Sequence, residues 1–342
     1  SDDEEAARND AIAIADMQPF AVIGGPLQSS AVFAAELAKA GVLCVATCAQ
    51  SLPDDVTEPY QGLLFQTGPT PNQAAAMAGE LISKMAGPGP AELAGDPALQ
   101  ETDRRYALVH YNTEGGTHTA VAEALGDSLA DNGIELSADV EYILDPAAIQ
   151  EDARTVIARL ESERITTVIF YGDPLMPKAL TEEATAQDYR PEWIITGSTG
   201  TDASALARQY DQEQWAHAFG ISLLTARADP EADVEETNIV SWYLGEELES
   251  YPNIFDFGRL FLGIHLAGPD LTPETFRDGM FSYDGTSGYA TLFGSSYGGE
   301  LWPWVDYLAT DDVTEIWWDP EAEGQDEAQD DGLKVGDRMH GR

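Results

Sequence analysis

The sequence predicts an α/β fold with sheets rich in parallel strands and room for two domains. Short apolar runs alternate with amphipathic segments of helix length over the first two-thirds of the chain, which is the rhythm of βαβ units. Many of these runs end in turns rich in glycine and hydroxyl side chains. The length of 342 residues leaves room for two domains with separate cores.

Residues 20–50 show this pattern most clearly. An apolar strand over residues 21–23 precedes a glycine turn, and a helix over residues 31–40 follows at once. Gly41 marks the end of that helix, since glycine commonly follows a last helical turn. Residues 42–45 form the next strand, so two neighbouring parallel strands are expected here.

Polar turns follow both of these strands. Gln28, Ser29 and Ser30 stand in the first turn, and Ala49 and Gln50 stand in the second. Open α/β sheets bind ligands at the carboxyl ends of their strands, so we expect these turns to form one half of a binding site. Hydroxyl groups beside the free N–H groups of a helix start favour a carboxylate or another anion.

A second α/β series begins near residue 105. Strands are predicted over residues 106–111, 167–171 and 193–196, and each ends in a polar turn. Asp173 stands in a Gly-Asp-Pro turn, where it can meet a ligand ammonium group or close the turn with its own side chain. The sequence leaves both readings open.

The composition is strongly acidic. The chain carries 61 acidic and 17 basic residues, a net charge of −44. A well-hydrated surface and an adaptation to high salt both fit this charge, whereas binding to nucleic acid does not. No apolar run reaches the length of about 18 residues that a membrane helix needs.

Sequence motifs for catalysis or cofactor binding are not found. The chain has no GxxxxGK[ST], no GxGxxG opening a helix and no GxSxG, and its five histidines lack the spacing of a metal site. We therefore expect no enzyme activity, no cofactor and no metal.

The two cysteines, Cys44 and Cys48, lie four positions apart at a strand end. On an extended strand their Cα atoms would be about 13 Å apart, beyond the reach of a disulfide. We expect two small buried residues, with Cys48 as a candidate for lining a pocket. A redox or zinc site would need CxxC spacing or further ligands.

The order of several segments resembles a known family, the type I solute-binding proteins of ABC importers, and most closely their branched-chain-amino-acid-binding branch. The first lobe is matched by AIAIADMQPFAVIGGPLQSSAVFAAELAKAGVLCVATCAQ and FQTGPTPNQAAAMA, and the second by RRYALVHYNTEGG, RLESERITTVIFYGD and EWIITGSTG. The ending LAGPDLTPETFRDGM is similar to secreted members. The resemblance covers nearly the whole chain and rests on the order of the motifs.

The resemblance implies an extracytoplasmic protein that captures a small polar ligand, such as an amino acid, an amide or a carboxylate-bearing solute, between its lobes. Such a protein is a monomer, periplasmic or at the cell surface with or without a lipid anchor, and it passes its ligand to a membrane permease. A ligand-sensing receptor domain of the same fold and an α/β hydrolase stay open as alternatives. The implied ligand residues are Gln28, Ser29, Ser30, Ala49, Gln50, Asn112, Asp173, Thr199 and Phe257.

The sequence departs from the family at several points. The amino-acid binders place a carboxylate where Thr199 stands, and an aromatic residue where Gly115 stands. A ligand ammonium group would therefore depend on Asp173. The family also begins with a strand, a helix and a second strand before the position of Asp2, and we expect lobe 1 to lack these elements.

The resemblance also implies two Rossmann-like lobes with parallel-rich sheets, joined by a three-strand hinge, and it implies where the lobes begin and end. Lobe 1 is expected over residues 1–102 and 218–284, and lobe 2 over residues 103–217 and 285–318. Residues 319–342 are acidic and are expected to form a mobile tail.

Overall fold

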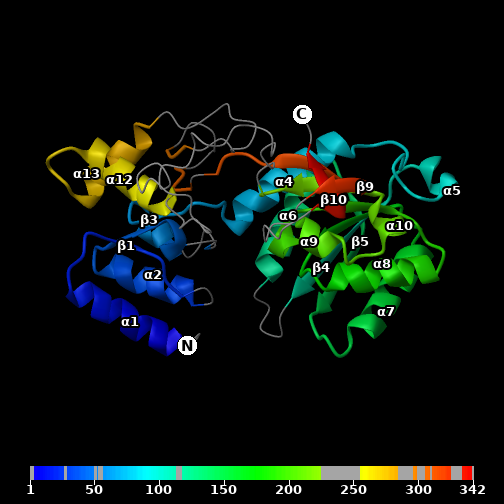
Figure 1. Ribbon diagram of the computed structural model, residues 1–342, viewed down its shortest axis with the longest axis horizontal. Coiled ribbons are helices and arrows are strands. Elements are labelled where there is room, and N and C mark those ends of the chain that lie inside the picture. The colour runs from blue at the N-terminus through cyan, green and yellow to red at the C-terminus, as the bar shows by residue number, and fades with distance from the viewer. Residues whose placement is uncertain are drawn as a thin grey trace. The chain divides into compact units, whose positions relative to one another are not determined.

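A computed structural model describes residues 4–26, 29–49, 52, 57–112, 118–224, 255–283, 296–298, 305–308, 310–324 and 333–340 of the chain. The chain forms two compact units (Figure 1). Unit 1 comprises residues 1–73 and 226–312, and unit 2 comprises residues 74–225 and 313–342. The chain thus passes from one unit to the other at three points.

Unit 1 contains a three-stranded parallel sheet with β2 in its centre. The strands are β1 (Ala21–Ile23), β2 (Leu43–Val45) and β3 (Leu64–Phe65). The helices of this unit are α1 (Glu4–Asp16), α2 (Ser30–Lys39), α12 (Phe255–Ala267) and α13 (Pro273–Phe281), with short 3₁₀ turns η1 (Ala46–Ala49) and η2 (Glu58–Tyr60).

Helices cover both faces of this sheet (Figure 1). On one face, α1 and α2 bury Ala7, Ala11 and Leu37 against Cys44 of the central strand. The four-residue spacing of Ala7 and Ala11 places both on one side of α1, as an amphipathic helix requires. The second core, on the other face, includes Phe276 and Met280 of α13.

Unit 2 contains a seven-stranded sheet in the order β10-β9-β8-β7-β6-β4-β5. Its first five strands along the chain are parallel, and β9 and β10 are antiparallel additions at one edge. The strands are β4 (Tyr106–Asn112), β5 (Leu136–Ile143), β6 (Thr167–Tyr171), β7 (Glu192–Ile195), β8 (Ala218–Ser222), β9 (Thr314–Gly324) and β10 (Lys334–His340).

The helices of unit 2 alternate with its parallel strands. They are α4 (Pro71–Met85), which begins in unit 1, α5 (Pro97–Gln100), α6 (Thr119–Asp131), α7 (Ile149–Ser162), α8 (Met176–Ala186), α9 (Ser204–Ala207) and α10 (Gln212–Trp215), with the 3₁₀ turn η3 (Ser198–Gly200). One core packs α7 and α8 against the sheet around Trp193 and Trp215.

The unit boundaries differ from the expected lobe boundaries. Residues 74–102 belong to unit 2, because α4 packs closely on α6: a Cβ at Gly79 would lie 2.1 Å from Ser128 Oγ, which donates a hydrogen bond to Ala76 O. Strand β8 also belongs to unit 2, because it pairs with β7 in the sheet. The third crossing follows Asp312.

The described part of the acidic tail is a β-hairpin, which corrects the expected mobile tail. Strand β9 alternates buried Ile316 and Trp318 with the exposed side chain of Trp317, the period-two pattern of a sheet with one covered face. On β10, Arg338 is buried and its Nη1 donates a 2.8 Å hydrogen bond to Asp202 O. The acidic composition concealed this alternation.

Candidate functional site

The first polar turn of unit 1 begins at Gly24, whose φ of +82° is accessible mainly to glycine. A Cβ on the next residue, Gly25, would lie 3.0 Å from the ring of Phe33. Ser29 then precedes α2 at its N-cap position, and Ser30 is the first helical residue. The two glycines thus follow β1 closely, and the hydroxyl pair stands at the start of α2.

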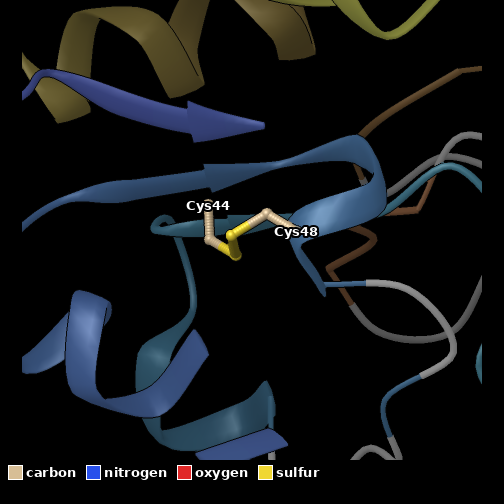
Figure 2. Close-up of a disulfide and its surroundings, with 2 residues drawn as sticks. All are labelled: Cys44 and Cys48. Atoms are coloured by element: carbon tan, nitrogen blue, oxygen red, sulfur yellow. A yellow bond between two sulfur atoms is a disulfide. The ribbon is translucent and has the colours of Figure 1, made fainter. Parts of the chain in front are cut away.

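The second turn follows β2 and carries a disulfide that corrects the sequence-based expectation. Cys44 lies in β2 and Cys48 in η1, and their Cα atoms are 5.3 Å apart (Figure 2). The expected separation assumed an extended chain. Ala46 instead adopts a φ of +59° and the chain folds into a 3₁₀ turn, which brings the two sulfur atoms together.

The other candidate ligand residues of unit 1 are Ala49, Phe257, Gln28 and Gln50. Ala49 is the last residue of η1, so the disulfide holds the turn to which it belongs. Phe257 lies on α12 with 53% of its surface exposed. Gln28 and Gln50 lie outside the described residues.

The candidates of unit 2 lie at the carboxyl edge of its sheet. The strand order changes direction at β4, which lies between β5 and β6, and ligands of open α/β sheets bind at such a switch point. Asn112 ends β4, and Asp173 follows β6. A cavity of about 980 Å³ lies beside Asn112, at the ends of β4 and β5 and against α7.

Asp173 makes the contacts of a helix-capping residue. Its Oδ1 accepts hydrogen bonds from the N–H groups of Leu175 (2.7 Å) and Met176 (3.1 Å) at the start of α8, and its Oδ2 accepts one from the Tyr142 hydroxyl (2.5 Å). Burial, followed by the charge of Asp173, raises the pKa of Tyr142 well above its ordinary value, which keeps the hydroxyl protonated as a donor. Of the two readings that the sequence left open, these contacts favour the turn-closing one.

Hydroxyl groups connect the turns after β6 and β7. The Ser198 hydroxyl accepts a hydrogen bond from Gly172 N (2.9 Å) and donates one to Gly172 O (3.0 Å). The Thr199 hydroxyl donates to the same carbonyl, from a backbone φ of +44°. The hydroxyl of Ser198 is therefore used to hold the two turns together, which counts against a nucleophilic role.

Asn112 is held from three sides. Its Nδ2 donates to Glu141 Oε2 (2.7 Å) and Thr119 Oγ1 (2.8 Å), and its Oδ1 accepts from His118 N (3.1 Å). The His118 ring lies 4.0 Å from the ring of Tyr111, and burial lowers the pKa of His118, so the imidazole is neutral at pH 7.

Sequence reasoning did not identify Tyr111, Tyr142 or Glu141 as residues of this edge. The alternation of buried and exposed positions along β5 was a usable signal, because it places Tyr142 on the covered face and Glu141 on the other. No sequence pattern indicated the pairing of Tyr142 with Asp173, which joins residues 31 positions apart.

No protein-family model and no curated protein sequence matches this chain. Solved structures match over nearly its whole length. A periplasmic binding protein type 1 from Bordetella pertussis Tohama I has 14% identity and a TM-score of 0.59, and the match covers 98% of this chain and 85% of that one. The chain has the type I periplasmic binding protein fold.

Two further structures with this fold match well. A putative branched-chain amino acid ABC transporter from Silicibacter pomeroyi has 13% identity and a TM-score of 0.65, with 96% of this chain and 82% of that chain covered. A solute binding protein of an ABC transporter from Rhodopseudomonas palustris HaA2, in complex with p-hydroxybenzoic acid, has 12% identity and a TM-score of 0.63, with 99% and 83% covered. The predicted fold class is confirmed.

Proposed function

We propose that this protein is an extracytoplasmic solute-binding protein that captures a small polar ligand and presents it to the membrane permease of an ABC importer. The observation that carries the proposal is the type I periplasmic binding protein fold over nearly the whole chain, shared with substrate-binding proteins of such importers. Capture would not involve chemistry: ligand binding favours one conformation of the protein over another.

The proposed ligand contacts come from the carboxyl edges of the two sheets. In unit 1, Ser29, Ser30 and the N–H groups at the start of α2 and in the turn of Ala49 would hold a carboxylate. Gln28 and Gln50 belong to the same turns by sequence. In unit 2 the candidates are Asn112, Asp173 and Thr199. In unit 1, Phe257 of α12 would supply an apolar wall.

We propose a carboxylate-bearing ligand in which an ammonium group is not required. Both oxygens of Asp173 already accept hydrogen bonds within the protein, so an ammonium group would compete with the N–H groups of α8 and with Tyr142 for this carboxylate. The R. palustris relative binds p-hydroxybenzoic acid, a carboxylate without an ammonium group. Aromatic and short aliphatic carboxylic acids are therefore the first ligands to test.

The disulfide supports an extracytoplasmic location. Structural disulfides persist mainly in oxidising compartments, such as the periplasm and the cell surface. Cys44 and Cys48 are both fully buried, as a structural bridge would be. No helix in the described part of the chain is long and apolar enough to cross a membrane. We propose a monomer that meets the permease at the membrane surface.

Thermal-shift screening of the full chain tests this function. A ligand that binds only the folded protein at 100 times its Kd adds about 2.7 kcal/mol of stability. That corresponds to a rise of about 5–10 °C in the Tm of a unit of this size. Benzoate, p-hydroxybenzoate, short aliphatic acids, leucine and leucinamide form a panel that separates carboxylate from ammonium recognition. No shift with any of them would count against the proposal.

Ser29→Ala then tests the anchor in unit 1. Loss of a hydroxyl donor to a charged carboxylate should weaken binding of the identified acid about tenfold or more. Ser162→Ala, an exposed serine of α7, is the matched control and should leave the affinity unchanged. Equal affinity in both variants would show that the anchor lies elsewhere.

A further inference from the structure

Unit 1 contains a cavity of about 250 Å³ beside β3. Its walls come from residues 57–61, from β3 and the residues that follow it, and from residues 305–308. The described lining does not include the ligand turns of Ser29 or Ala49, so the cavity is separate from the site proposed above. The volume is just below the range of about 300–1,000 Å³ that is usual for pockets of drug-sized ligands.

A buried amide forms the polar centre of this cavity. Gln66 is 1% exposed and lines the cavity, and its Oε1 accepts a 2.9 Å hydrogen bond from Leu52 N. Because an N–H donor needs the oxygen of the amide, this bond fixes the orientation of the side chain. Gln66 Nε2 donates no hydrogen bond to another described residue, so its NH₂ group is a donor that a molecule in the cavity can use.

A second donor is available beside it. Thr70 is buried and lines the cavity, and its Oγ1 accepts a 3.1 Å hydrogen bond from Gln73 N at the start of α4. That bond uses a lone pair of the hydroxyl oxygen and leaves its hydrogen able to donate. The amide of Gln66 and the hydroxyl of Thr70 can both serve a ligand oxygen.

The remaining lining restricts the chemistry of the ligand. Leu64, Val305 and Leu308 supply apolar surface, and Glu58 is exposed at the rim. No lysine, arginine or histidine is among the described lining residues. A buried carboxylate without a cation would be costly, whereas an uncharged carbonyl oxygen would suit the two donors.

We propose that this cavity is a second binding site, which takes a small uncharged carboxamide. The carbonyl oxygen of the ligand accepts from Gln66 and Thr70, its short aliphatic part lies against Leu64 and Leu308, and its NH₂ group faces Glu58 at the rim. The site goes beyond the proposed transport function, because it lies outside the ligand turns and selects against the charged group that those turns would hold.

The cavity lies where two segments of unit 1, distant in sequence, are joined by hydrogen bonds. Gln66 forms a parallel bridge with Leu308, and its N–H donates to Tyr307 O at 2.9 Å. Thr310 Oγ1 also donates to Thr67 O at 2.7 Å. These residues belong to the two segments by which the chain leaves unit 1, at residues 73–74 and 312–313. A bound amide therefore contacts both of these segments at once.

Titration of the ¹⁵N-labelled full chain with propionamide tests the site. We expect saturable shifts of the Gln66 side-chain NH₂ resonances and of the Leu52 amide, with sodium propionate producing much weaker shifts. Gln66→Met keeps the length of the side chain but removes its donor, and should weaken binding about three- to tenfold, as for one neutral hydrogen bond. Gln150→Met, at an exposed glutamine of α7 outside the cavity, is the matched control and should bind like the natural protein.

Gln66→Met also removes the partner of Leu52 N and can therefore disturb the fold. Val305→Trp avoids this problem, because Val305 is largely exposed and a larger side chain there narrows the cavity without altering a buried hydrogen bond. It should abolish the propionamide shifts while the rest of the spectrum is retained. Absence of saturable binding to the natural protein, binding unchanged in Val305→Trp, or equal affinity for propionamide and propionate would each overturn the proposal.

Discussion

The carboxyl edges of the two sheets are held in shape by different means. In unit 2, side-chain hydrogen bonds fix the edge: Asp173 caps α8 and accepts from Tyr142, and Ser198 and Thr199 join the turns after β6 and β7. In unit 1, a covalent bond from β2 to η1 fixes the second turn (Figure 2). The polar side chains of unit 2 thus already bond within the protein, while in unit 1 we propose that the N–H groups at the start of α2 hold the ligand. This difference predicts that substitutions at the edge of unit 2 lower the free energy of unfolding more than substitutions at the edge of unit 1 do.

The largest effect is expected for Asp173→Ala. The substitution removes the side chain that accepts from the first N–H groups of α8 and leaves the Tyr142 hydroxyl without its acceptor. The free energy of unfolding of unit 2 should therefore fall by about 3 kcal/mol. Urea unfolding followed by tryptophan fluorescence measures this, since Trp193 and Trp215 lie in the core of unit 2. Asp145→Ala is the matched control, because Asp145 closes an exposed turn with a similar bond to Ala147 N. Similar losses for both variants would show that Asp173 is not a key residue of the edge.

Removal of the disulfide should lower the free energy of unfolding of unit 1 by about 2 kcal/mol. The chain-entropy relation gives this value for so short a loop, and Cys44→Ala with Cys48→Ala is the variant that tests it. Hydrogen exchange should speed up at residues 46–49 and stay unchanged in α7. Dithiothreitol should have the same effect on the natural protein and none on the double variant. Unchanged exchange at residues 46–49 would mean that packing alone holds this turn.

A pH titration separates the units further, because unit 1 buries the carboxyl group of Asp306, which forms no salt bridge with another described residue. Burial raises the pKa of Asp306 to about 7, with the neighbouring Asp311 adding to the rise, and the hydrogen bonds from Gln73 Nε2 and Leu308 N oppose it. A raised carboxyl pKa in the folded state means that the folded state binds the proton more tightly. Its stabilising contribution is present at low pH and is lost as the pH rises toward the folded pKa.

Unit 1 should therefore lose about 2 kcal/mol of stability between about pH 5 and pH 8 from this group. Asp306→Asn keeps an oxygen that can accept from Gln73 and Leu308 but removes the titration, so the slope should become flatter in this variant. Stability curves of equal slope for the natural protein and Asp306→Asn would contradict the assignment.

The smallest effect is expected for Thr199→Val. The substitution keeps the β-branched shape and removes the hydroxyl that donates to Gly172 O, at a cost of about 1 kcal/mol. Thermal unfolding measures it, with Thr155→Val, an exposed position of α7, as the control. A loss in Thr199→Val that does not exceed that of the control would show that Ser198 alone holds the two turns together.

Much of the fold could be predicted from the sequence, because periodic apolar positions such as Ala7 and Ala11 report directly which face of an element is covered. The strand ends that carry Asn112, Asp173 and Thr199 were also located correctly along the chain. These features depend on residues close together in sequence, and local physical chemistry is sufficient to indicate them.

Features that depend on backbone conformation or on distant partners were not predictable. The φ of +59° at Ala46, a residue that seldom adopts it, produces the disulfide turn. The unit boundary within α4 depends on the contact of Gly79 with Ser128, and the role of Asp173 depends on Tyr142 from another strand. The ligand residues of the site stay predictions, with Gln28 and Gln50 outside the described residues.

The interleaved path of the chain determines when each unit can complete its folding. The core of unit 1 includes Phe276 and Met280, and the sheet of unit 2 is completed by β10 near the end of the chain (Figure 1). Unit 1 cannot complete its core until α13 has been synthesised, and unit 2 cannot complete its sheet until β10 has been, because contacts between distant residues form only when both partners are available. The early segments of unit 1 therefore remain without their full core while the parallel strands of unit 2 are being synthesised.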